Sequence, residues 1–78
     1  MLVLRNISKS NNTIEADFYP EDGKEYGHIK VDLLTGKYIS ITLAKGYENS
    51  TSPSHARREL IAMANLAELP KERMVMWY

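Results

Sequence analysis

The segment YGHIKVDLLTGKYISITLA, residues 26–44, decides the fold, because two alternating runs flank a short turn that contains a glycine. Alternation with a period of two is the signature of a strand that buries one face. The segment therefore predicts two antiparallel strands with their apolar residues on a common face. Those apolar residues are Ile29, Val31 and Leu33 in the first strand, and Ile39, Ile41 and Leu43 in the second.

The turn between these strands predicts their register. A three-residue loop over residues 34–36, with its glycine in the left-handed conformation, is a common hairpin connection. It would place Val31 across from Ile39, and Ile29 across from Ile41. A slip of one residue would scatter the apolar side chains over both faces, so the turn and the pattern agree.

Two more strands are predicted before this segment. Residues 2–7 form a short apolar run, and we expect the polar cluster at residues 8–12 to end it. Residues 13–19 then alternate between apolar and acidic residues, and Pro20 to Gly23 supply a turn. The first half of the chain is therefore read as four consecutive strands.

After the segment, the period changes to that of a helix over residues 54–68. Ser52 is the expected N-cap and Pro53 the first helical residue, where a missing N–H costs nothing. Pro70 is expected to end the helix, because the residue before a proline is pushed out of the α region. An apolar stripe is expected to face the sheet; its members are Ala56, Leu60, Met63, Ala64 and Ala67.

The last five residues, 74–78, are apolar and rich in strand formers, which predicts a final strand. The order β-β-β-β-α-β predicts one α+β domain over residues 1–78. Its antiparallel or mixed five-stranded sheet carries one helix packed across one face. The uncovered face should be polar; it would carry Glu15, Asp17, His28, Lys30, Asp32, Tyr38, Ser40 and Thr42.

Composition narrows the class of function. The 78 residues are 44% hydrophobic and 26% charged, as in an ordinary globular protein, and their formal net charge is zero. A nucleic-acid binder usually carries a basic excess. Without cysteine, the chain has no disulfide and no thiolate zinc site. We expect a cytoplasmic protein that binds no metal and does not insert into a membrane.

Catalytic motifs are absent from the sequence. It contains no glycine-rich phosphate loop, no nucleophile elbow and no metalloprotease motif. The two histidines, His28 and His55, fall in different predicted elements. His28 is expected on the polar sheet face, near Lys30 and near Glu15 or Asp17, but an open face offers it neither an orienting carboxylate nor a pocket that excludes water. We therefore expect a protein that is not an enzyme and needs no cofactor; a deep pocket that joins Glu15, Asp17 and His28 would reverse this view.

The leading hypothesis is a non-catalytic protein-interaction module that binds a protein partner or a second copy of itself through the sheet face or edge away from the helix. Its final strand is apolar on both faces, and the chain holds five tyrosines and a tryptophan. Tyrosine and tryptophan are enriched at interfaces. The residues expected to make contact are Tyr38, Val75, Trp77 and Tyr78.

The alternative is a small nucleic-acid-binding accessory protein. His55, Arg57 and Arg58 lie at the predicted start of the helix, where unpaired backbone N–H groups attract anions. Tyr38 would stack on a base. This hypothesis requires the basic residues to converge on one surface; they are Lys30, Lys37, Lys45, Arg57 and Arg58.

Overall fold

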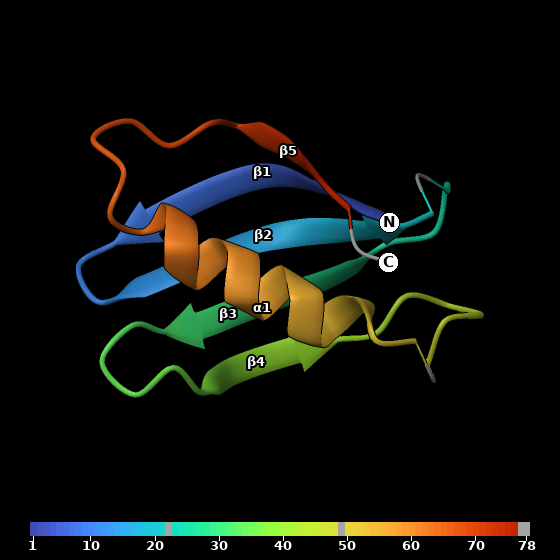
Figure 1. Ribbon diagram of the computed structural model, residues 1–78. Helices are drawn as coiled ribbons and strands as arrows, with labels where there is room; N and C mark the ends of the chain where they lie inside the picture. The colour runs from blue at the N-terminus through green and yellow to red at the C-terminus, as the bar shows by residue number, and fades with distance from the viewer. Residues whose placement is uncertain (22, 49, 77–78) are drawn as a thin grey trace.

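The computed structural model describes residues 1–21, 23–48 and 50–76, which form one antiparallel sheet crossed by one helix (Figure 1). The strands lie side by side in the order β4-β3-β2-β1-β5. The α+β fold class and the element order predicted from the sequence are confirmed. The elements are β1 (Leu2–Ser10), β2 (Thr13–Pro20), β3 (Gly27–Asp32), β4 (Tyr38–Thr42), α1 (Ser52–Met63) and β5 (Glu72–Val75).

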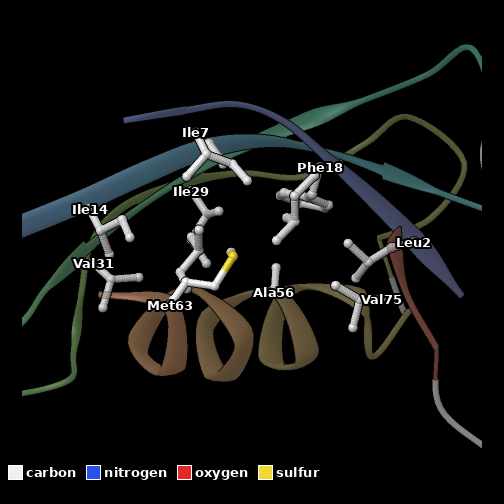
Figure 2. Close-up of a cluster of buried hydrophobic side chains, with 12 residues drawn as sticks. Leu2, Ile7, Ile14, Phe18, Ile29, Val31, Ala56, Met63 and Val75 are labelled. Carbon is white, nitrogen blue, oxygen red and sulfur yellow. The ribbon is translucent and has the colours of Figure 1, made fainter. Parts of the chain in front are cut away.

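The core lies between α1 and one face of the sheet. Figure 2 shows Ala56 and Met63 directed from the helix toward the sheet's side chains. The predicted alternation explains why the core lies on one face of the sheet, since every second residue of β2 and β3 is buried. The buried cluster comprises Leu2, Leu4, Ile7, Ile14, Ala16, Phe18, Ile29, Val31, Ala56, Leu60, Met63 and Val75.

Strand β1 is longer than predicted, because the polar cluster does not end it. The strand continues to Ser10, and only Asn11 and Asn12 form the turn. Its register with β2 shifts between Arg5 and Ser8, where Asn6 adopts a φ of 56°. Such a bulge inserts one extra residue. It returns Ile7 to the helix-facing side, which polar and apolar alternation alone did not predict.

The hairpin between β3 and β4 departs from the predicted register at one pair. Ile29 lies across from Ile41 as predicted, but Val31 lies across from Tyr38, so the expected pairing with Ile39 is wrong. The Asp32 N–H donates a hydrogen bond to the Lys37 carbonyl oxygen at 2.9 Å, so the loop spans residues 33–36 and is one residue longer than predicted. The Asp32 carboxylate also accepts a hydrogen bond from the Leu34 N–H at 2.8 Å. A register shift between Lys30 and Val31 then leaves Ile39 as the extra residue of β4.

Helix α1 starts and ends earlier than predicted. Ser52 is already helical, Thr51 is the N-cap without a side-chain cap bond, and the helix ends at Met63. The Lys9 ammonium donates a hydrogen bond to the Ala64 carbonyl oxygen at 3.2 Å, which places a cation where the helix dipole favours one. Because the helix already ends at Met63, Pro70 does not end it. Ala67, which was predicted on the buried stripe, is exposed.

Strand β5 pairs antiparallel with β1 and forms one edge of the sheet. It spans residues 72–75, whereas a strand over 74–78 was predicted. Val75 lies across from Leu2 and is buried in the core, while Met74 is exposed. The prediction for Trp77 and Tyr78 lies outside the described residues.

The close contact between Gly27 and Phe18 generates a prediction about stability. A Cβ atom at Gly27 would overlap the Phe18 ring and the Thr42 carbonyl oxygen. Overpacking of a filled core costs about 1–3 kcal/mol, so Gly27→Ala should lower the free energy of unfolding by about 2 kcal/mol in urea titration. The control is Gly23→Ala, whose Cβ would lie 3.3 Å from the Pro20 carbonyl oxygen. Equal losses for the two variants would contradict this role of Gly27.

Candidate functional site

Strand β4 presents an unpaired apolar edge. It is the outermost strand on its side of the sheet, and all five of its residues are exposed. Four apolar side chains on and next to it keep between 39% and 51% of their surface accessible. We call this the β4 edge surface; it consists of Tyr38, Ile39, Ile41 and Leu43.

The position of α1 explains this exposure. The helix packs mainly on β2 and β3 and lies across the middle of the sheet, as Figure 1 shows. Ile41 lies across from the buried Ile29, yet remains 39% exposed because it belongs to the edge strand. The predicted apolar face of β4 therefore exists in part, but the described residues of the chain do not bury it.

Tyr38 lies on the helix side of the sheet, which corrects its predicted place on the polar face. It pairs with the buried Val31, and the Arg57 guanidinium lies 5.6 Å from the centre of its ring. The register shift at Ile39 causes this change of face. Tyr38 thus joins the β4 edge surface and does not lie with Ser40 for base stacking.

The opposite edge has a smaller apolar surface. In β5, Val75 is only 8% exposed and packs in the core, so it has a structural role. Met74 and the following Met76 are more than half exposed. Of the four predicted contact residues, Tyr38 is accessible and Val75 is not, and Trp77 and Tyr78 lie outside the described residues.

The uncovered face of the sheet holds a polar cluster of Glu15, Asp17 and His28, which the sequence placed on this face without predicting that His28 contacts both carboxylates. His28 Nδ1 lies 2.8 Å from Asp17 Oδ1, and its Nε2 lies 3.2 Å from Glu15 Oε1. The Asn6 side-chain amide donates to Asp17 Oδ2 at 2.9 Å. The expectation that this face offers His28 no carboxylate is wrong. Pairing of Asp17 with His28 in the β2–β3 register could have indicated the contact.

The side chains of this cluster contact one another across the strands. Both ring nitrogens of His28 lie within hydrogen-bonding distance of a carboxylate oxygen. Lys30 lies 3.9 Å from the second oxygen of Glu15. No group of three or more metal-ligating side chains occurs in the described part of the chain. The cluster is therefore a cross-strand polar network that links β2 and β3.

Two of the tyrosines pack on the same uncovered face. The rings of Tyr19 and Tyr26 stack with their centres 4.9 Å apart, and the Arg5 guanidinium lies 4.5 Å from the Tyr19 ring. Val3 pairs with Tyr19 and is almost fully buried although it belongs to this face. Cross-strand packing thus accounts for part of the tyrosine surplus.

A pocket of about 260 Å³ lies at the start of α1 and is lined by Ser54, His55, Arg57 and Arg58. The three residues predicted to contact anions therefore do come together. Arg57 also donates a hydrogen bond to the Gly36 carbonyl oxygen at 3.0 Å. Lys30 does not join them, because it pairs with Glu15 on the other face of the sheet. The predicted convergence of the basic residues is only partial.

Comparison with protein-family models, curated proteins and solved structures gives no match. No helix among the described residues has the length and apolar character that crossing a membrane requires. The function is therefore argued from the surfaces of the chain alone.

The polar cluster yields a prediction about stability. Asp17→Ala removes the carboxylate that contacts both His28 and Asn6, and its side chain is only 19% exposed. We expect the free energy of unfolding to fall by about 1–2 kcal/mol, measured in urea. Glu15→Ala is the matched control; its contacts are longer and more exposed, so it should cost less than about 1 kcal/mol. The reverse order would show that the cluster is not centred on Asp17.

Proposed function

We propose that this protein is a non-catalytic interaction module that binds a protein partner through the β4 edge surface. The observation that carries the proposal is an outermost strand whose five residues are all exposed and whose side chains are largely apolar. Monomeric proteins usually protect such edges. An edge left open and apolar is suited to a partner.

Strand addition is the mode of binding that this geometry favours. An edge strand has a row of N–H and C=O groups that can pair with an extended segment, and side chains add specificity. In β4, hydroxyl groups of Ser40 and Thr42 alternate with apolar side chains, so a partner strand meets two chemically different faces. The backbone would supply affinity, and Ile41 and its apolar neighbours would supply selectivity.

The non-catalytic part of the proposal depends on the surfaces already described. The β4 edge surface carries one hydroxyl group that can take part in acid–base chemistry, the Tyr38 phenol, and its other three side chains are aliphatic. Glu15 and Asp17, the carboxylates best suited to catalysis, both contact His28, and the described pocket at α1 includes none of the three. The lack of cysteine fits a reducing compartment, and we propose the cytoplasm as the setting.

Photo-crosslinking tests this proposal. A photoreactive amino acid in place of Leu43, 41% exposed, should form a covalent adduct with a protein in the cells that produce this chain. The same group at Leu66, 48% exposed and outside the sheet, is the control and should form little adduct. Adding Ile41→Lys to the first variant should abolish the adduct, because a charged side chain would then lie in the middle of the β4 edge surface. Equal labelling from both positions, or none from Leu43, would contradict the proposal.

Contact with nucleic acid is the second candidate function, and the pocket lined by His55, Arg57 and Arg58 is the observation that favours it. Three features weaken it. The net charge is zero, Arg57 already contacts Gly36 and Tyr38, and Lys30 belongs to the other face. A phosphate backbone would therefore meet few basic side chains on one surface.

Gel retardation separates the two candidates. We expect no retardation of single-stranded or duplex oligonucleotides at low salt, because few cations converge. Arg58→Ala, at an exposed position in the pocket, should leave this result unchanged. Retardation that weakens with salt and is lost in Arg58→Ala would favour the nucleic-acid function instead.

A further inference from the structure

Strand β4 has a neighbouring strand on one side, because it is the outermost strand of the described sheet. It pairs with β3, and the register shift at Ile39 interrupts that pairing close to the start of the strand. Helix α1 packs on β1, β2, β3 and β5, but not extensively on β4. A segment with few packing contacts opens locally at a low free energy. Any further attachment near the start of β4 therefore affects how often this strand opens.

The Arg57 side chain of α1 reaches the start of β4. Its guanidinium donates a hydrogen bond to the Gly36 carbonyl oxygen at 3.0 Å, and it lies 5.6 Å from the centre of the Tyr38 ring. A charged donor makes a stronger hydrogen bond than a neutral one, and a guanidinium within about 6 Å of an aromatic ring is attracted to its face. One side chain of the helix thus contacts the residues on both sides of Lys37.

The backbone of the β3–β4 loop connects this contact to the strand pairing. Gly36 adopts a φ of 75°, which favours glycine, and its N–H donates to the Asp32 carbonyl oxygen at 2.7 Å. The Asp32 N–H donates to the Lys37 carbonyl oxygen at 2.9 Å. Arg57 therefore acts on the same short segment as the hydrogen bonds that join the end of β3 to the start of β4.

The first residue of the loop has an attachment of its own. The Leu33 N–H donates to the Asn12 carbonyl oxygen, in the turn between β1 and β2, at 2.7 Å. Leu33 also packs against the core. The loop is therefore held at Leu33 without Arg57, whereas its other end, at Gly36, contacts Arg57 and leads into the edge strand.

We infer that Arg57 is a positioning residue for the β4 edge surface, because it holds the start of β4 in the sheet and so keeps the edge ordered for a partner. This inference rests on the proposed function, since it concerns the same surface. A segment that is already ordered loses less conformational entropy on binding, so it binds more tightly. Arg57 contributes to binding in this way without being one of the four residues of the β4 edge surface.

Amide hydrogen exchange, followed by NMR on the purified chain, tests the positioning role. Arg57→Ala removes both contacts, so the start of β4 should open more often. We expect the Asp32 and Gly36 amides to exchange at least about tenfold faster, because a hydrogen bond from a charged group is lost. The Leu33 amide should keep its rate to within about twofold, because its hydrogen bond goes to Asn12.

Two further variants make this result specific. Arg57→Met keeps an apolar stem and removes the guanidinium, so it should give the same pattern even if Arg57→Ala folds poorly. Arg58→Ala is the matched control, since Arg58 is exposed and lines the same pocket, and it should change none of these rates by more than about twofold. If Arg57→Met leaves all three rates unchanged, or speeds the Leu33 amide by the same factor as the other two, the inference is overturned.

The photo-crosslinking experiment supplies a second readout and separates two kinds of failure. With the photoreactive group at Leu43, Arg57→Met should lower the yield of adduct at least about threefold, and Arg58→Ala should leave it unchanged. An equal yield in Arg57→Met would show that the surface binds its partner without Arg57, so this inference would be wrong and the proposed function would stand. If no variant forms an adduct, both are wrong.

Discussion

A single helix has to cover a five-stranded sheet, and the rest of this structure depends on that mismatch in width. An α-helix is about 10 Å wide with its side chains, whereas five strands spaced about 4.8 Å apart span roughly 19 Å between their outer axes. Helix α1 packs mainly on β2 and β3, whose inward-facing side chains belong to the core. The outer strands keep part of their apolar surface, because the described chain has no second helix to place over them.

The two uncovered regions are handled in different ways. On the face away from α1, the side chains satisfy one another: Asp17 and Glu15 contact His28, and Arg5 packs on Tyr19. Along β4, by contrast, Arg57 lies over the Tyr38 ring, but the apolar side chains still keep between 39% and 51% of their surface exposed. A polar network needs no partner, whereas an apolar edge strand gains from one. The β4 edge surface is therefore the basis of the proposed function.

Sequence reasoning and structure differ most where backbone irregularities change the face of a side chain. Bulges at Asn6 and Ile39 each insert a residue, so Ile7 enters the core and Tyr38 moves to the helix side. A bulge is hard to detect in an alternating sequence, because it inserts only one extra residue. The contacts of His28 were missed for another reason, since they depend on which residues of β2 and β3 face each other.

By itself, the sequence determined the element order, the class of fold and most of the buried face, because alternation and turn residues act over a few neighbouring positions. Only the tertiary structure decided that β4 and β5 are the edges, that α1 ends at Met63 and that Val75 is buried. These features depend on strand order and helix placement, which arise from contacts between residues far apart in the chain.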